Sequence, residues 1–281
     1  MFTQIPLEGN ALAVFPDAHA LDDSTMQRIA KELNLSETVF IGPSALPNCS
    51  GSFRIFTPTR EMAFAGHPTV GAASVALDER LVPSNTSTFW VEEKVGRVKI
   101  RIDAGEAPLI WLETPPIAFE QLFDRTRCAK SLQLPLTDLL DIQPQIVNAG
   151  NPTLLVTVRD KSVVDRAIVD NTVLSSIARD YPAPFCLFVF APVETGAYSR
   201  MFAPDYGIAE DPASGSATGP LAAFMKRHNL LPGSATGRFV SEQGTKMGRR
   251  SLLHFEFSDF GDVISVGGHV APVIEAVMTI G

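Results

Sequence analysis

A glutamate that could serve as a general acid and base stands between a predicted helix and a predicted strand. Glu37 follows Ser36 and comes shortly before the apolar run 39–41. Successive side chains of a strand point to opposite faces, so Glu37 shares a face with Val39. If that face is inward, partial desolvation favours proton exchange near neutral pH, which general acid/base catalysis requires. A glutamate at such a junction is more commonly a solvated loop residue, so the residue alone leaves both interpretations open.

Two glycine-containing segments precede predicted helices and could bind an anionic group. Gly66-His67-Pro68 opens the small-residue run 72–76, and Ser214-Gly215-Ser216 opens the run 221–225. Glycine allows a ligand to approach the backbone, and the free N–H groups and dipole of a helix N-terminus attract anions. Two such ends facing each other could hold one carboxylated substrate. Ordinary capping explains either segment taken alone.

Other catalytic and cofactor motifs are missing from the sequence. The five histidines show no H-x-x-x-H spacing, which argues against a local metal site. No G-x-S-x-G, dinucleotide-binding or phosphate-loop motif occurs, so neither a hydrolase elbow nor a nucleotide cofactor is indicated. Cys49, Cys128 and Cys186 form no C-x-x-C pair, which disfavours a disulfide framework and a thiolate metal site and fits a reducing compartment.

The composition indicates a soluble globular protein without a nucleic-acid or membrane partner. Of 281 residues, 45% are hydrophobic and 19% are charged, which argues against disorder and coiled coil. The net charge is −8, and the compact basic group Lys246, Arg249 and Arg250 is too small to neutralise a run of phosphates. The longest apolar run, 185–193, is far shorter than the ~20 residues that span a bilayer, and residues 1–10 lack a basic export signal. We therefore expect a cytoplasmic protein.

Short strands are predicted to outnumber helices. Period-two hydrophobic patterns predict strands over residues 12–15, 39–41, 53–56, 98–102, 109–112, 154–158, 187–190, 252–257, 263–266 and 273–278. Helical patterns are limited to 24–33, 68–77, part of 162–181 and 217–228. Regular βαβ alternation is therefore disfavoured, and the expected class is α+β.

The chain also contains an internal repeat. Four pairs of segments recur in the same order: Gly9-Asn10 and Gly150-Asn151, Arg54-Ile55-Phe56 and Arg200-Met201-Phe202, Gly66-His67-Pro68-Thr69 and Gly215-Ser216-Ala217-Thr218, and residues 90–93 and 239–242. The last two pairs share one register, because both are separated by 149 residues. The pattern predicts two homologous halves, each a set of strands around one small-residue helix, with a boundary near 113–118.

Taken together, these segments resemble the phenazine-biosynthesis PhzF-like isomerase family, which shares its fold with diaminopimelate epimerase. The matching segments cover nearly the whole chain and are Gly9-Asn10, Ser36-Glu37-Thr38, residues 56–62, Gly66-His67-Pro68-Thr69 and residues 210–217. The resemblance implies two pseudo-repeated domains, each a β-barrel-like sheet around a central helix. The N-terminal domain would span 1–113 and include a returning C-terminal strand at 271–281, and the C-terminal domain would span 114–270. Family analogy also implies a homodimer.

The resemblance further places an active site in the cleft between the two domains. It implies Glu37 as the acid/base, supported by His67 and Asp211. The residues expected to bind the substrate are Ser36, Gly66, Ser214, Gly215 and Ser216. The family more often has threonine at position 214, so the shape of the substrate site is expected to differ there.

The epimerase relatives use two cysteines, one before each helix, and Ala65 and Ser214 occupy those positions here. Two-thiol racemisation is therefore excluded, because alanine cannot carry a proton. One carboxyl can take a proton from one carbon and return it to another on the same face. We therefore expect an isomerase of small carboxylated metabolites that needs no cofactor, whether metal, nucleotide or flavin. Two alternatives stay open: a binding or scaffold protein of the same fold without turnover, and a lyase that uses the same base.

Overall fold

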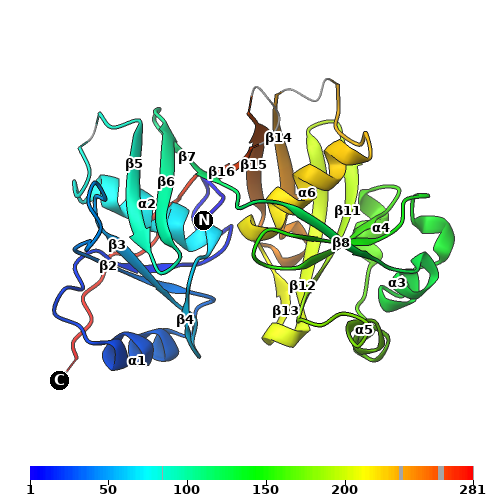
Figure 1. Cartoon of the computed structure of the whole chain (residues 1–281), viewed down its shortest axis with the longest axis horizontal. Coiled ribbons are helices and arrows are strands. Elements are labelled where there is room, and N and C mark those ends of the chain that lie inside the picture. Colours follow the sequence, from blue (N-terminus) through cyan, green and yellow to red (C-terminus); the bar gives the residue numbers. More distant parts are fainter. Residues whose placement is uncertain (84, 234–236, 259–262, 281) are drawn as a thin grey trace.

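The two halves of the chain form two lobes that lie side by side (Figure 1). This computed structural model describes residues 1–83, 85–233, 237–258 and 263–280. The lobes are connected by the antiparallel pairing of β7 (Leu109–Glu113) with β16 (Ile264–Gly268), in which Leu112 lies opposite Val266. A single path of paired strands therefore runs through both lobes, from β1 at one end to β8 at the other.

The strands of the N-terminal half surround one helix, α2 (Gly66–Asp78), which is buried along most of its length. These strands pair in the order β1-β2-β3-β5-β6-β7, with β4 beside β3. The other elements of this half are β1 (Ala13–Phe15), α1 (Asp23–Leu33), β2 (Thr38–Gly42), β3 (Ser52–Phe56), β4 (Glu61–Met62), β5 (Thr88–Glu93) and β6 (Gly96–Asp103).

The C-terminal half is built in the same way around α6 (Gly215–Arg227). Its strands pair in the order β16-β15-β14-β12-β11-β10-β9-β8, with β13 beside β12. Its other elements are β8 (Ala118–Leu122), α3 (Arg125–Ser131), η1 (Leu136–Asp138), β9 (Gln145–Asn148), β10 (Thr153–Thr157), α4 (Lys161–Arg166), α5 (Asn171–Ala178), β11 (Cys186–Val193), β12 (Gly196–Ala203), η2 (Pro204–Tyr206), β13 (Ile208–Asp211), β14 (Arg238–Gln243), η3 (Thr245–Met247) and β15 (Ser251–Phe257).

The strand pairings confirm the internal repeat. β1 and β2 are parallel, as are β10 and β11, and both β2–β3 and β11–β12 are antiparallel. The parallel pair β3–β5 recurs as β12–β14, and the hairpin β5–β6 recurs as β14–β15. The fold is therefore α+β with two pseudo-repeated halves, as the sequence predicted.

The predicted repeat register is correct for the helices and wrong for the strands that follow them. β5 and β14 each contain six residues with the same alternation of burial, which matches Phe89 with Phe239 and Glu93 with Gln243. The spacing there is 150 residues, because β14 starts one residue later after α6 than β5 does after α2. A shift of one residue exchanges the two faces of a strand, so the register of 149 pairs Glu93 with Glu242, which lies on the opposite face.

Aspartate caps define where the surface helices begin. Asp22 accepts a hydrogen bond from the backbone N–H of Thr25 at 2.8 Å, which starts α1 close to the predicted residue 24. The helical pattern within 162–181 is two helices, because Asp160 caps α4 and Asp170 caps α5. Along the described ranges, no helix is both long enough and apolar enough to cross a membrane.

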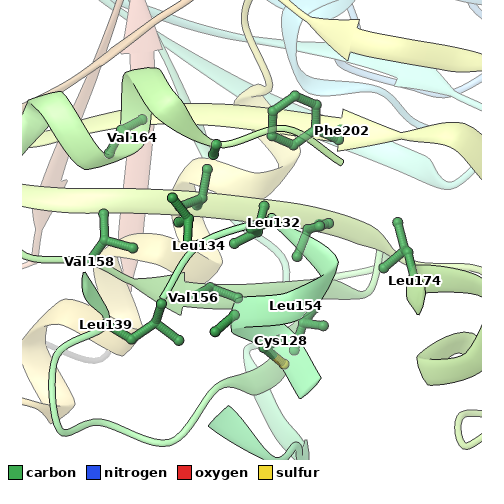
Figure 2. Close-up of a cluster of buried hydrophobic side chains, with 14 of the residues drawn as sticks. Cys128, Leu132, Leu134, Leu139, Leu154, Val156, Val158, Val164, Leu174 and Phe202 are labelled. Atoms are coloured by element: carbon green, nitrogen blue, oxygen red, sulfur yellow. The ribbon is translucent and has the colours of Figure 1, made fainter. Parts of the chain in front are cut away.

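The C-terminal lobe has apolar side chains on both faces of its central strands. One face packs against the short helices α3 to α5, where Leu132 and Val164 meet Leu154 and Val156 of β10 (Figure 2). The other face, which includes Leu155, packs in the cluster that contains α6. Strands that are buried on both faces read as continuous apolar runs, as β10 and β11 do. This packing fixes β12, which pairs with β13, the strand that ends at Asp211.

The predicted returning strand at 271–281 is not a strand over residues 271–280, and Gly281 lies outside the described residues. The segment nevertheless runs alongside the N-terminal lobe toward α1 (Figure 1), where Met278 and Ile280 line a pocket with Phe15 and Ile29. Pro272 offers no N–H for pairing, and β1 at the edge of the sheet contains only three residues. The domain boundaries at 113 and 270 stay predictions.

Candidate active site

The N-termini of α2 and α6 meet between the two lobes. A Cβ atom built on Gly66 would lie 3.5 Å from the carbonyl carbon of Gly215 and from the backbone N of Ser216. A Cβ atom on Gly215 would lie 3.5 Å from the backbone N of His67. Because neither residue has a side chain, both helix ends present free backbone N–H groups to the same region. The two glycine segments therefore face each other, as the sequence analysis considered.

Glu37 and His67 approach each other at this junction. Glu37 Oε2 lies 3.0 Å from His67 Nε2, and the two side chains are 16% and 9% exposed. The atoms do not have the directional geometry of a hydrogen bond, and neither has another hydrogen-bond partner within the described part of the chain. The two atoms therefore face each other without forming a hydrogen bond, and both retain hydrogen-bonding capacity for a bound molecule.

The burial of Glu37 has a different cause from the predicted alternation. Residues 38–41 are all buried, so both faces of β2 are covered. Strand alternation therefore does not separate buried from exposed side chains here. Glu37 precedes this strand and is half-buried because it faces His67 at the start of α2. Ser36, expected to bind substrate, lies next to it in the same loop and is also half-buried.

Asp211 ends β13 and is buried on the C-terminal side of the same junction. One carboxylate oxygen accepts a hydrogen bond from Asn10 Nδ2 at 2.9 Å, and the other accepts one from the Ser214 hydroxyl. Burial raises the pKa of Asp211 to about 6, against the opposing effects of the His67 charge and of the hydrogen bond from Ser214. The negative charge of Glu37 also raises this pKa, so both of the other predicted catalytic residues influence Asp211 electrostatically.

Asn10 is a site residue to which the sequence assigned no role. Its amide donates to Asp211 and, at 3.1 Å, to the backbone oxygen of Ala213, so it joins the N-terminal half to the loop before α6. Gly9 before it has a φ of +69°, and a Cβ atom there would lie 2.1 Å from the backbone oxygen of Met1. Glycine is therefore required for this turn. The repeated Gly-Asn segment was the signal that could have identified Asn10.

Gln243 is the second residue that the sequence analysis missed. Its Nε2 donates to the backbone oxygen of Asp211 at 2.7 Å and to Ser214 Oγ at 2.9 Å. Its Oε1 accepts from the backbone N of Ser214 at 3.2 Å. A lone glutamine at the end of a strand carries no recognisable signal, and the predicted register placed Glu242 there instead.

The remaining predicted substrate-binding residues differ in accessibility. Ser214 is buried and its hydroxyl is directed to Asp211, so this side chain orients the carboxylate. Ser216 is half-buried, and with Gly66 and Gly215 it lines a small cavity whose other walls are largely apolar. Phe2 forms part of those walls, and a Cβ atom on Gly215 would lie 3.1 Å from its ring.

Thiol chemistry has no support at this site. Cys128 and Cys186 are buried, and desolvation raises the pKa of each thiol to about 12. The two positions before the helices are held by Ala65 and Ser214. Among the residues that the structure describes, no group of three histidine, cysteine or acidic side chains could hold a metal ion.

Comparison with known proteins places this arrangement in a family. The family model for phenazine biosynthesis-like protein (PhzC-PhzF) matches residues 1–276. An uncharacterized isomerase of Mesorhizobium japonicum is 32% identical over 300 residues, which covers 98% of this chain and 95% of the relative. The trans-2,3-dihydro-3-hydroxyanthranilate isomerase of Pseudomonas chlororaphis is 32% identical over 260 residues, covering 90% of this chain and 86% of that protein.

A solved structure agrees on the fold. The PhzF-family phenazine biosynthesis protein of Bacillus anthracis superposes with a TM-score of 0.88 at 24% identity, covering 99% of this chain and 96% of that one. The chain therefore belongs to the phenazine biosynthesis-like (PhzF) family. It is an isomerase of that family, and its two-lobed fold is the one the sequence resemblance implied.

Proposed function

We propose that this isomerase moves a proton within a small carboxylated metabolite and that Glu37 is its only acid/base. The observation that carries the proposal is the contact between Glu37 and His67. Both facing atoms are buried and lack hydrogen-bond partners in the described structure, beside two helix N-termini with free N–H groups. Such a site offers a proton acceptor next to a region that favours anions.

In the proposed reaction, the substrate carboxylate binds at the N-termini of α2 and α6. The Glu37 carboxylate takes a proton from an acidic carbon, and the electron pair of that C–H bond enters the conjugated system of the substrate. The N–H groups near Gly66 and Ser216 stabilise the developing negative charge. Glu37 then returns the proton to a different carbon, so a double bond shifts and the composition of the substrate is unchanged.

His67 and Asp211 have supporting roles in this proposal. His67 holds the Glu37 carboxyl in place from α2, the helix that also supplies Gly66. Asn10 and Ser214 fix Asp211 from both lobes. The carboxyl group of Asp211 therefore has a defined orientation toward the substrate. Because burial raises the pKa of Asp211 to about 6, this carboxyl group takes up a proton in mildly acidic solution and can then donate a hydrogen bond to the substrate.

The first substrate to test is a dihydroaromatic amino acid of the kind that the Pseudomonas relatives isomerise. The name of those relatives specifies trans-2,3-dihydro-3-hydroxyanthranilate. This compound has a carboxylate and a conjugated ring with acidic C–H bonds, as the proposed chemistry needs. Family analogy also leads us to propose a homodimer, which light scattering of the purified protein tests directly.

Isotope exchange tests the proposed acid/base role. The protein is incubated in heavy water with this compound and a panel of cyclic carboxylic acids, and deuterium incorporation is followed by mass spectrometry and NMR. We expect incorporation with the wild type and with Glu32→Gln, an exposed neighbour on α1, and none with Glu37→Gln. Exchange that survives Glu37→Gln would contradict the role. A product that gains or loses water would indicate a lyase, and saturable binding without exchange would indicate a binding protein.

A further inference from the structure

A second buried glutamate lies beneath the helix that carries His67. Glu93 is the last residue of β5 and is 4% exposed. Its Oε1 contacts the hydroxyl of Thr69 in the first turns of α2, whereas its Oε2 is buried with no hydrogen-bond partner in the ranges described. The Thr69 hydroxyl also lies 2.8 Å from the backbone oxygen of Ala65, the residue at the N-terminal cap of α2.

Counting protons assigns the ionisation state of this glutamate. A threonine hydroxyl has one proton to donate, and the Thr69 hydroxyl lies between two acceptor oxygens, those of Ala65 and Glu93. Each contact can be a separate two-centre hydrogen bond only if Glu93 carries a proton and donates a hydrogen bond to Thr69, which then donates one to Ala65. Burial acts in the same direction, because desolvation raises the pKa of Glu93 to about 8.

The other half of the repeat supports this assignment. Thr218 donates to the backbone oxygen of Ser214 at 3.0 Å, as Thr69 does to Ala65. At the strand position that matches Glu93, the C-terminal half has Gln243, a neutral amide with partners for both of its polar atoms. An amide always has one donor group and one acceptor atom, whereas a carboxyl group has both only when it is protonated.

In the described parts of the chain, no charged group compensates an ionised Glu93. Charged and titratable groups on and around β5 have other contacts: Arg54 of β3 with Glu61 of β4, Lys94 with Glu61, Glu92 with Ser44, Arg97 of β6 with the ring of Trp90, and His67 of α2 with Glu37. The pKa of Glu93 is therefore determined by burial and by Thr69 alone.

We propose that Glu93 is a positioning residue for the reaction. As a neutral carboxylic acid it anchors the first turn of α2, and with it His67 and Gly66. Loss of its proton leaves an uncompensated charge beneath that turn and weakens the contact that holds the turn in place. The activity of the isomerase therefore falls at alkaline pH. The part of this inference that concerns activity rests on the proposed function, and the part that concerns the neutral carboxyl group does not.

The protonation state can be measured without any substrate. Infrared spectra at pH 7 should show a carboxylic-acid band in the wild type that is absent from Glu93→Gln. Asp211 is mostly ionised at that pH and contributes little to such a band. Glu92→Gln, on the opposite face of the same strand, is the matched control and should keep the band. Thr69→Val, which removes the hydroxyl that accepts the hydrogen bond from Glu93, should shift the band and provides the test if Glu93→Gln does not fold.

The pH dependence of unfolding gives a second test. Because the folded-state pKa of Glu93 is raised, its contribution to stability is complete below about pH 4.5 and is lost as the pH rises through about 8. We therefore expect the unfolding temperature of the wild type to fall by a few degrees relative to Glu93→Gln between pH 5 and 9, with Glu92→Gln following the wild type. An identical pH dependence in wild type and Glu93→Gln would overturn the proposal.

Activity completes the test once a substrate is known. Glu93→Gln should retain exchange activity at pH 7 and keep up to about tenfold more of it at pH 9 than the wild type does, because a group with a pKa of about 8 loses about nine-tenths of its protonated form over that range. If the fall in activity at alkaline pH disappears in Glu93→Gln and not in the control variant, Glu93 has a positioning role. If Glu93→Gln shows the same fall as the wild type, this role is contradicted. If no variant, including the wild type, exchanges any compound, the proposed function fails, and the infrared and unfolding comparisons still decide whether Glu93 is neutral.

Discussion

Asn10 Nδ2 donates a hydrogen bond of 2.9 Å to Asp211 Oδ1, although the two residues are 201 positions apart in the sequence. This bond crosses from the segment before β1 in one lobe to the last residue of β13 in the other. The carboxyl group of Asp211 is therefore positioned by both lobes at once. A relative movement of the lobes would change its environment, which couples the geometry of the cleft to the chemistry of the site.

Removing this bond should weaken both the site and the fold. Asn10→Ala leaves one oxygen of Asp211 and the backbone oxygen of Ala213 without their donor, which we expect to cost about 1–3 kcal/mol in the free energy of unfolding. It should also raise the pKa of Asp211 further, because a hydrogen bond to the charged form is lost. Urea unfolding and NMR titration measure the two effects. Asn151→Ala, at the repeated position in the other half, is the control and should leave the pKa of Asp211 unchanged.

The raised pKa of Asp211 predicts a specific pH dependence of stability. Its folded-state pKa of about 6 exceeds its ordinary value of 3.8, so its contribution to stability is complete below about pH 3.8 and is lost as the pH rises through 6. At about 1.4 kcal/mol for each pKa unit, the loss is at most ~3 kcal/mol. Asp211→Asn should fold and lack this change, which urea unfolding between pH 4 and 8 reveals. Parallel curves for the two proteins would contradict the raised pKa.

Substitution of Gln243 should reduce the free energy of unfolding more than substitution of an ordinary strand residue does. Gln243→Leu keeps the approximate volume but leaves the backbone oxygen of Asp211 and the backbone N of Ser214 without partners. Each unsatisfied buried group costs roughly 1–3 kcal/mol, so we expect a loss of about 3 kcal/mol in thermal or urea unfolding. Glu242→Leu, one residue earlier on the other face of β14, should cost much less. Equal losses for the two variants would disprove the register of 150 residues.

Local patterns predicted the parts of the site that depend on backbone geometry. The glycine segments at 66 and 215 and the apolar strands around them have short-range signals, and the helices indeed begin at those glycines. The strand at 273–278 was wrong because period-two hydrophobicity does not report whether a partner strand is available. Edge pairing depends on the length of β1, which is a property of the assembled sheet.

Residues that act through long-range contacts were not predictable from the residues alone. Gln243 bonds to Asp211 and Ser214, and its role depends on a register that a single extra loop residue shifts. Glu93 resembles an ordinary strand glutamate until its burial and its contact with Thr69 are known. The resemblance to a family supplied Glu37, His67 and Asp211, and their mutual arrangement required the tertiary structure.

The contact between Gly66 and Gly215 predicts that substrate binding can be blocked without loss of stability. A Cβ atom on Gly66 would be at ordinary van der Waals distance from the opposite helix end, 3.5 Å, and its backbone is not in the left-handed region, so Gly66→Ala should change the free energy of unfolding by less than about 1 kcal/mol. The methyl group would occupy the space in front of the free N–H groups, and the KM of a carboxylated substrate should rise at least tenfold. Gly196→Ala is the contrasting variant, because its φ is +139° and its Cβ atom would lie 2.4 Å from the backbone oxygen of Val240, so it should destabilise the fold. An unchanged KM in Gly66→Ala would mean that the substrate carboxylate does not bind at the helix junction.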